Sequence, residues 1–378
     1  MLASIMDTLM IPPPQLASQS CLNADLREDS DHACHRCRDV CPAGAIQLSD
    51  SDAPLPLVDS TACTGCTGCV SICPTDAMRH ADVKPAALVR HCTQLAQQGK
   101  TVVTAACSTA DRAHADITIP CHAAWTPMLL ASLAAEGIKQ LYLDGIDQCS
   151  DCPMRFGAEI MQQTEKDYAV FNQALGVHLS ISHGSQQRDA SMAAGSADKP
   201  ADEPERRAFF RHLIPSLAQG AARASEQLTQ AARLAANAQP QTESAPVRSP
   251  LPVRLQLFLR ALPKLQSNFM PLPAMPSMPL GAIQADAHCT ACGQCVETCP
   301  TCALHLREFG SNRILEFRAD ACIGCSRCID ICPAQALEAL PGISLPAVLT
   351  KKARPLVMVA YSDTRADSAD SNSSDGGE

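Results

Sequence analysis

Short apolar runs alternate with longer helical stretches between residues 86 and 182. Three of these runs have the length and apolar composition of buried strands, rather than the polar alternation of surface segments. They are KTVVTAAC at 100–107, ADITIPC at 115–121 and IKQLYLDG at 138–145. Strands that alternate with helices predict a small α/β domain with a parallel sheet.

The stretch TPMLLASLAAEG, residues 126–137, predicts a helix inside this region. Thr126 is a suitable N-cap, Pro127 is tolerated in the first turn, and Gly137 is a common residue at a helix end. We therefore expect a strand–helix–strand unit in which the carboxyl ends of the strands meet at one edge of the sheet.

The pattern changes after residue 182. Residues 183–205 are polar and predict a disordered linker, and residues 206–265 form a largely helical region. The stretch LPKLQSNFMPLPAMPSMPLG at 262–281 is rich in Pro and Met, which predicts extended, loop-like chain. Residues 346–378 predict a mostly disordered tail, because they end in SDTRADSADSNSSDGGE.

Both ends of the chain carry an internal repeat. The four copies are CHRCRDVCPAGAI at 34–46, CTGCTGCVSICPTDAM at 63–78, CTACGQCVETCPTCAL at 289–304 and CIGCSRCIDICPAQAL at 322–337. They form two pairs with nearly the same internal spacing, so we expect two copies of one small domain. The first copy has three cysteines where the others have four, because Asp31 occupies the place of the first thiol.

Composition narrows the possible functions. The chain has 378 residues, enough for two or three domains, and a formal net charge of −9. The sequence contains no block of Lys and Arg, which argues against binding to nucleic acid or to an anionic membrane surface.

The 22 cysteines are clustered at tight, repeated spacings. The N-terminal residues lack a secretory pattern, and no apolar stretch has the length of a transmembrane helix. Clustered thiols in a chain expected to be cytoplasmic are better explained as metal ligands than as disulfides.

The spacing C-x2-C-x2-C-x3-C-P is a specific signal for iron–sulfur chemistry. Three thiolates at that spacing can surround one face of a cubane, and the fourth, followed by Pro, ligates the other cluster of a pair. Glycines between the ligands allow the backbone to approach a cluster closely. These are Gly65, Gly68, Gly293 and Gly324.

Residues 20–80 and 285–340 resemble bacterial two-cluster ferredoxins in this motif. The resemblance implies four [4Fe–4S] clusters, two at each end of the chain. Its ligand sets are Cys289, Cys292, Cys295 and Cys332; Cys322, Cys325, Cys328 and Cys299; Cys63, Cys66, Cys69 and Cys41; and Cys34, Cys37 and Cys73 with one ligand missing.

Cys21 is the preferred candidate for the missing ligand. It is the only cysteine N-terminal to Cys34, and the polar residues between the two could form a closing loop. Asp31, which stands in the register of the missing thiol, and a three-iron cluster without a fourth ligand are the alternatives. His32 and His35 are weaker candidates, because such clusters prefer thiolates.

The middle region holds further cysteines that follow predicted strands. Cys107, Cys121, Cys149 and Cys152 could converge at one sheet edge, whereas Cys92 is expected to be a small buried side chain. Zinc is an alternative ligand for these four thiols, and a redox-active dithiol at Cys149 and Cys152 is another. For the repeated motifs zinc is disfavoured, because zinc sites use separated C-x2-C pairs.

Residues 100–160 also resemble the delta-type iron–sulfur subunit of hydrogenase and heterodisulfide reductase systems. The matching features are Cys107 after a strand, Cys121 in IPC before a helix, and the stretch AAEGIKQLYLDGIDQCSDC. The resemblance implies a [2Fe–2S] cluster on Cys107, Cys121, Cys149 and Cys152. Cys302 stands where the other repeats have Gly44, Asp76 and Gln335, so we expect it beside a cluster and not bound to it.

These expectations combine into an α+β protein with two ferredoxin-like dicluster domains, which flank a small α/β domain and a helical linker region. The expected boundaries are 20–85, 86–182, 183–205, 206–265, 266–345 and 346–378. The sequence has no dinucleotide-binding fingerprint, P-loop or hydrolase motif.

Three functions are compatible with this layout. The first is an electron-transfer polyferredoxin, accessory to or a subunit of a larger oxidoreductase such as a formate dehydrogenase or hydrogenase-type complex. The second is a maturation or delivery factor for a molybdenum or iron–sulfur enzyme. The third is catalysis at the middle cysteines, which a free thiol of low pKa at Cys149 or Cys152 would favour.

Overall fold

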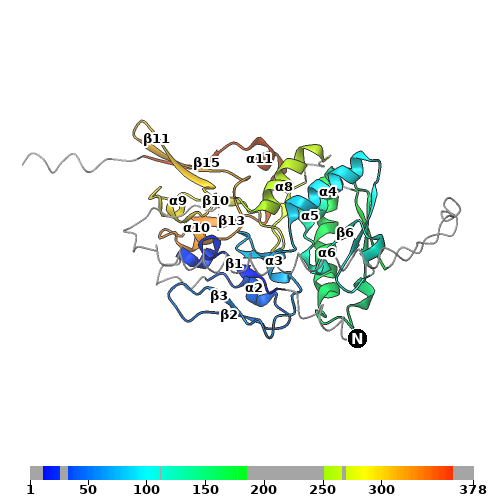
Figure 1. The fold of residues 1–378 in the computed structure, drawn as a ribbon. Helices are drawn as coiled ribbons and strands as arrows, with labels where there is room; N and C mark the ends of the chain where they lie inside the picture. The colour runs from blue at the N-terminus through cyan, green and yellow to red at the C-terminus, as the bar shows by residue number, and fades with distance from the viewer. Residues whose placement is uncertain are drawn as a thin grey trace, which may run out of the picture. The chain divides into compact units, whose positions relative to one another are not determined.

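The fold was analysed in a computed structural model, which describes residues 12–25, 33–110, 112–176, 178–184, 251–265 and 270–360 (Figure 1). Most of the expected linker at 183–205, the expected helices at 206–238 and the chain after residue 360 lie outside the described residues.

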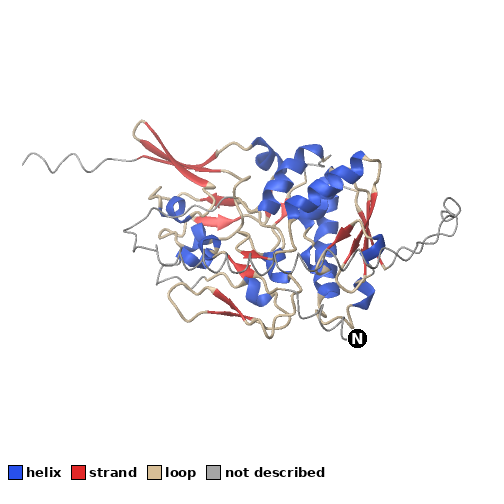
Figure 2. Ribbon diagram, in the orientation of Figure 1, coloured by secondary structure: helices blue, strands red, loops and turns tan. Residues whose placement is uncertain are grey.

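The N-terminal region consists of short elements joined by loops (Figure 2). Strand β1 pairs antiparallel with β4, and β2 pairs antiparallel with β3. The elements are β1 (Gln15–Leu16), α2 (Arg36–Asp39), β2 (Ile46–Leu48), β3 (Pro56–Val58), α3 (Gly68–Ile72) and β4 (Met78–Arg79). A separate small core forms around Ile46, Val70 and Met78, which are packed against Cys37, Cys69 and Cys73.

The middle region contains a four-stranded parallel sheet in the order β6-β5-β7-β8. Three of its strands lie where the apolar runs predicted them. The elements are α4 (Pro85–Gln97), β5 (Val102–Ala106), β6 (Ile117–Thr118), α5 (Pro127–Ala135), β7 (Gln140–Asp144), α6 (Gly157–Leu175) and β8 (Ser180–His183). Because the strands are parallel, the loops that carry the middle cysteines all leave from the same sheet edge.

Helix α5 begins and ends as its sequence predicts. The Thr126 hydroxyl accepts a hydrogen bond from the Leu129 N–H at 3.3 Å, and Pro127 occupies the first turn. Gly137 then adopts a φ of +99° just after the helix. Helix α5 is buried at every residue from Pro127 to Leu133, as expected for a helix with apolar residues on all sides.

The C-terminal region begins with α8 (Val253–Ala261), which packs on α5 of the middle region. Phe258 of α8 and Phe171 of α6 are fully buried, with ring centroids 5.1 Å apart. The remaining elements are β9 (Leu272–Pro273), β10 (Ile283–Ala285), α9 (Gln294–Thr298), β11 (Leu304–Phe309), β12 (Asn312–Phe317), α10 (Arg327–Asp330), β13 (Leu337–Ala339), β14 (Gly342–Ile343), α11 (Leu345–Thr350) and β15 (Arg354–Ala360).

The prediction of a disordered tail is wrong for residues 346–360. They contain most of helix α11 and all of strand β15, which pairs antiparallel with β12 in the three-stranded sheet β11-β12-β15. Val348 of α11 is fully buried. The apolar run PLVMVA forms this strand. The sequence analysis assigned it to the tail because the chain that follows is polar.

The described part of the Pro- and Met-rich segment has one short helical turn at Leu262–Lys264, is otherwise strand or loop, and is largely packed. Leu272, Met278 and Leu280 are at most 2% exposed, and β9 pairs with β14. These three side chains are part of the core, so they do not offer a free binding surface to a partner enzyme.

Among the described residues, none of the helices combines the length and apolar character needed to cross a bilayer.

Candidate metal centres

The missing ligand of the first repeat has a clear structural candidate. Four cysteines line one small cavity of the N-terminal region, here called the Cys21 site: Cys21, Cys34, Cys37 and Cys73. Burial, with the neighbouring thiolates of Cys34, Cys73 and Cys21, raises the pKa of Cys37 to about 12. Burial also raises the pKa of Cys21 to about 11, and the charges of Cys73 and Cys34 contribute. The structure thus brings Cys21 to the three motif cysteines.

Asn23, which the sequence analysis missed, fixes the loop that carries Cys21. Its side-chain amide donates to the carbonyl oxygens of Cys34 at 2.9 Å and Pro54 at 2.8 Å. Its oxygen accepts from the Cys34 N–H at 2.7 Å. The side chain is fully buried, so all three bonds are shielded from water. No sequence pattern marks this residue, because its partners are distant in the chain.

The other candidates for this ligand are less well placed or are not described. Asp31 and His32 lie outside the described residues. His35 has a half-exposed side chain, and its ring nitrogens lie near the Ala33 carbonyl and the Asp39 carboxylate.

The second N-terminal set, here called the Cys63 site, comprises Cys41, Cys63, Cys66 and Cys69. Burial raises the pKa of Cys69, and the charges of Cys66, Cys63 and Cys41 raise it further. Cys37 also raises the Cys69 pKa, which places the two N-terminal sets next to each other.

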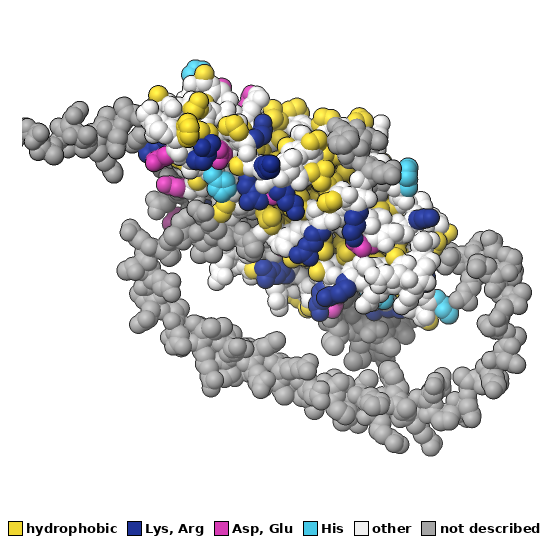
Figure 3. All heavy atoms as spheres, turned by 90° about the horizontal axis from the view of Figure 1, so that it is seen from above, with side chains coloured by type: hydrophobic (Ala, Val, Ile, Leu, Met, Phe, Trp, Pro, Cys, Tyr) yellow, Lys and Arg dark blue, Asp and Glu magenta, His cyan; other side chains and the backbone are white. Residues whose placement is uncertain are grey.

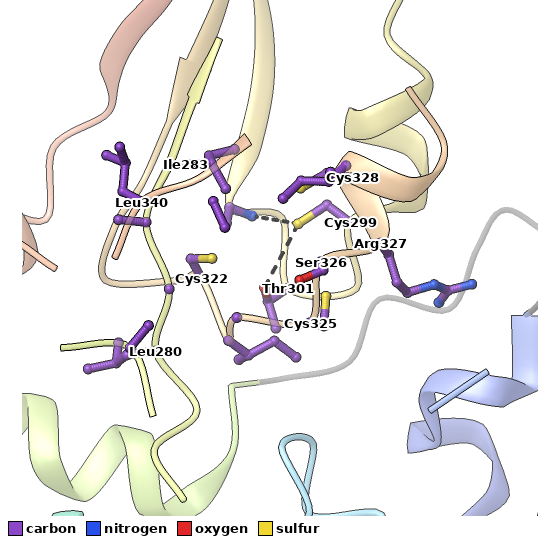
Figure 4. A pocket seen from close by; sticks show the side chains of 18 of the residues that line it. Leu280, Ile283, Cys299, Thr301, Cys322, Cys325, Ser326, Arg327, Cys328 and Leu340 are labelled. Atoms are coloured by element: carbon purple, nitrogen blue, oxygen red, sulfur yellow. Dashed lines mark hydrogen bonds between the residues drawn. The ribbon is translucent and has the colours of Figure 1, made fainter. Parts of the chain in front are cut away.

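The C-terminal cysteines separate into two sets in the same way. The Cys322 site consists of Cys299, Cys322, Cys325 and Cys328, which line a cavity of about 260 Å³. Figure 4 shows the labelled cysteines of this set around the cavity, with thiols from α10 and from the loops. The Cys289 site consists of Cys289, Cys292, Cys295 and Cys332, which line a separate small cavity.

The sulfur atoms accept hydrogen bonds in a pattern that recurs between the repeats. The N–H four residues after the cysteine in each Cys-Pro pair reaches its Sγ at 3.3 Å for Cys41, 3.2 Å for Cys299 and 3.4 Å for Cys332. Cys289 and Cys322 are the first cysteines of their repeats, and burial raises the pKa of both thiols. In each case the backbone N–H two residues later donates a hydrogen bond to the sulfur and lowers this pKa. Cys21 receives the same bond from the Asn23 N–H. Cys21 therefore shares this backbone hydrogen bond with motif cysteines such as Cys34, Cys66 and Cys325.

The backbone explains the position of Cys302. Cys302, Gly44, Asp76 and Gln335 share a left-handed backbone, with φ between 49° and 61°. Asp76 and Gln335 are not small residues, so the shared requirement is this conformation rather than side-chain size. Among the glycines between ligands, Gly65, Gly293 and Gly324 also have positive φ. A Cβ on Gly68 would instead lie 2.8 Å from the Ile160 side chain.

The middle cysteines converge at the carboxyl edge of the parallel sheet. Burial raises the pKa of Cys121 to about 12, with contributions from the charges of Cys66, Cys149 and Cys107. Burial also raises the pKa of Cys149, and Cys152 and Cys107 contribute. Cys121 and Cys152 pack in one buried cluster. These four residues are called the Cys107 site below.

Two glycines leave room for these thiols. A Cβ on Gly157 would lie 2.6 Å from the Cys121 sulfur, and a Cβ on Gly145 would lie 2.7 Å from the Cys107 sulfur. Both distances are shorter than real Cβ contacts. Sequence reasoning did not select Gly157, which begins helix α6.

Cys107 differs electrostatically from its neighbours. Burial alone would raise its pKa, but hydrogen bonds from His122 and Thr109 outweigh burial and lower it to about 7. The opposite shift at Cys149 does not favour a low-pKa nucleophile there. Cys92 is fully buried in α4, and burial raises its pKa to about 12.

Cys66 connects the N-terminal region to the middle region. It packs against the buried cluster of Cys121, Ala123, Cys152 and Met154. Its charge is the largest single contribution of another thiolate to the raised pKa of Cys121. The Cys63 site and the Cys107 site are therefore neighbours.

The donor sets fit clusters better than single ions. Within the ranges that the structure describes, no three His, Cys, Asp or Glu side chains converge as they do around one metal ion. The thiolates of a cubane each bind a different iron and stand farther apart. Grouped, buried thiols also raise one another's pKa, so a cationic metal core would be needed to hold them as thiolates.

Comparison with protein-family models gives two matches, each to the 4Fe–4S dicluster domain. One covers residues 32–78 and the other covers residues 288–336. Two 4Fe–4S dicluster ferredoxin domains thus lie at the two ends of the chain. They imply about four [4Fe–4S] clusters and point to an iron–sulfur electron-transfer protein. The searches of curated proteins and of solved structures returned no match.

Proposed function

We propose that this chain is a multi-cluster electron relay in which each of the four motif sites holds one [4Fe–4S] cluster. The supporting observation is that the motif cysteines separate into four sets, three of which line a cavity of their own. Cys21 is the proposed fourth ligand of the first cluster. Each cluster would accept and release one electron, and the protein would supply the ligands and the hydrogen bonds that tune the potentials.

The Cys107 site is proposed to hold a fifth cluster, of the [2Fe–2S] type. The gathering of Cys107, Cys121 and Cys149 supports this assignment, as does the space left by Gly145 and Gly157. The adjacent Cys66 would make the Cys63 site its electron-transfer neighbour.

Iron content and electron paramagnetic resonance (EPR) spectra of anaerobically purified protein test both assignments. We expect about 16 iron atoms from four cubanes and about 18 with the middle cluster. A content near 8 would overturn the relay, and a content near 16 would remove the fifth cluster.

A glycine variant tests the middle site more sharply. Gly157→Ala should abolish the [2Fe–2S] signal, because the added methyl group would overlap the Cys121 sulfur. Gly184→Ala controls for backbone strain without a steric clash, since a Cβ there meets no atom within 4 Å but its φ of +95° disfavours Ala. Equal spectra for Gly157→Ala and the unmodified protein would count against a cluster on Cys121.

The proposed partner is a larger oxidoreductase, such as a formate dehydrogenase or hydrogenase-type enzyme. The resemblance of residues 100–160 to a delta-type subunit supports this class. On the face seen in Figure 3, Lys and Arg side chains are spread over the described surface, so acidic groups do not dominate that face. Rapid reduction of the clusters by formate or hydrogen through a candidate partner would support the proposal, and no reduction by either route would contradict it.

A further inference from the structure

Arg36 lies between the two dicluster domains. It is the first residue of α2 in the N-terminal domain, and it lines the cavity of the Cys21 site. The same side chain lines the cavity of the Cys322 site in the C-terminal domain. Its guanidinium donates a hydrogen bond to the Gly324 carbonyl at 3.1 Å, between Cys322 and Cys325. One cation therefore borders two of the four proposed clusters.

A second arginine lies on the other side of this junction. Arg327, in α10, lines the cavity of the Cys322 site, and Figure 4 shows it extending from α10 toward the N-terminal segment. Arg36 from the N-terminal domain and Arg327 from the C-terminal domain therefore line the same cavity.

The other two motif sites have other neighbours, and neither Arg36 nor Arg327 lines the cavity of the Cys289 site. The Cys63 site contacts the Cys107 site through Cys66. The Cys289 site contains Cys292, the only exposed residue among the 22 cysteines, all of which the structure describes. Within each domain the two sites adjoin, because α2 packs against α3 and α9 packs against α10.

We propose that electrons cross between the dicluster domains at the Arg36 junction, so that the Cys21 and Cys322 sites are the inner members of the relay. The Cys63 and Cys289 sites are the outer members. This order rests on the proposed ligand sets. In the step itself, a reduced inner cluster passes one electron to its oxidised neighbour, and no bond forms or breaks. A one-electron donor at one end supplies the electron.

Arg36 is a positioning residue with an electrostatic role in this scheme. Reduction adds a negative charge to a cluster, and a cation beside it favours that form. The low-dielectric surroundings strengthen the effect. Arg36 should therefore raise the potentials of both inner clusters while its bond to Gly324 keeps them adjacent.

The test is a redox titration followed by EPR on Arg36→Gln, with Arg38→Gln as the control. Arg38 is two residues away on the same helix, and its half-exposed side chain pairs with Asp39. In Arg36→Gln, we expect two of the four clusters to titrate at lower potential at unchanged iron content. Arg38→Gln should leave all four unchanged, and Arg36→Lys should recover much of the shift because it keeps the charge. Unchanged potentials in Arg36→Gln, with all four clusters present, would overturn the electrostatic role.

The order of the sites has a test that uses no arginine variant. In the fully reduced protein, neighbouring clusters speed each other's spin relaxation. Cys34→Ala, which removes the inner N-terminal cluster, should slow the relaxation of the C-terminal pair. Cys63→Ala, which removes the outer one, should leave that relaxation unchanged. An equal or larger effect of Cys63→Ala would overturn the order. A protein with only two clusters before any substitution would instead overturn the proposed function.

Discussion

The two dicluster domains carry the same motif, but they complete their sites differently. The C-terminal domain supplies all eight thiols at regular spacing from its two repeats. The N-terminal domain supplies seven in register, and the structure places Cys21, on a segment held by Asn23, in one cavity with three of them. The comparison shows that packing can bring thiols together where the repeated spacing does not.

The two domains also differ in how they attach to the rest of the protein. The C-terminal sites belong to the large core that includes the parallel sheet and α8. The N-terminal domain has a small core of its own, and α8 contacts it through Arg254. This buried arginine donates to the Val70 carbonyl and to Asp76 at 2.8 Å. Leu22 of the N-terminal domain also joins the large core, so the polar contacts of Arg254 add to an attachment that is partly apolar.

The largest expected effect is that of Cys21→Ala. It should remove the cluster of the Cys21 site, or leave a three-iron form, at a cost of up to about four iron atoms per chain. Cys289→Ala should cause the matching loss in the C-terminal pair. Iron analysis and EPR check both, and an intact set of four cubanes in Cys21→Ala would show that another residue supplies the ligand.

Arg254→Met should weaken the attachment of the N-terminal domain alone. Loss of the buried guanidinium removes the donor to the Val70 carbonyl and leaves Asp76 with the Val253 N–H, which should cost about 2–4 kcal/mol. Thermal unfolding, followed by bleaching of the cluster absorbance, should show an earlier transition for two of the four clusters. Arg260→Met, an exposed position on the same helix, is the control and should leave the transition unchanged. A uniform shift for all four clusters would contradict this division.

Asn23→Ala should weaken the same N-terminal cluster site as Cys21→Ala, but less strongly. It removes three buried hydrogen bonds of the Cys21 loop, at a cost of about 1–3 kcal/mol in local stability. We expect faster loss of one N-terminal cluster under a chelator, with the C-terminal clusters unaffected. Asn23→Asp keeps the acceptor for the Cys34 N–H but places an oxygen against two carbonyl oxygens in a buried site, so it should lose iron at least as fast as Asn23→Ala. If Asn23→Ala loses iron no faster than the unmodified protein, the loop is held by other contacts.

The smallest expected effects on stability are those of substitutions at Gly44 and Gln335, which share a left-handed backbone. Gly44→Ala should destabilise the N-terminal domain by about 1 kcal/mol, because a Cβ is disfavoured at its φ of 61°. Gln335→Gly in the C-terminal domain relieves the same strain but makes the unfolded chain more flexible, so its net effect should lie between 0 and about 1 kcal/mol of stabilisation. Chemical denaturation of both variants provides the comparison, and a clear loss of stability in Gln335→Gly would show that its side chain makes needed contacts.

Local features of the fold were predictable from the sequence. The runs around β5, β6 and β7 identified the strands, and Thr126, Pro127 and Gly137 marked helix α5. Strand β15 was missed, since it pairs with the distant β12 and stands next to a polar tail. The packing of Met278 in the Pro-rich segment was missed for the same reason.

By itself, the sequence determined the dicluster domains and the thiols of the repeats, because ligand spacing within a short segment is a local property of the chain. Only the tertiary structure decided which further thiol lies beside Cys34, Cys37 and Cys73 and which sites adjoin. Cys21, Asn23 and Arg36 act on partners that are far away in the sequence, and such contacts depend on how the whole chain packs. The bond from Arg36 to Gly324, which joins the two ends of the protein, is the clearest example.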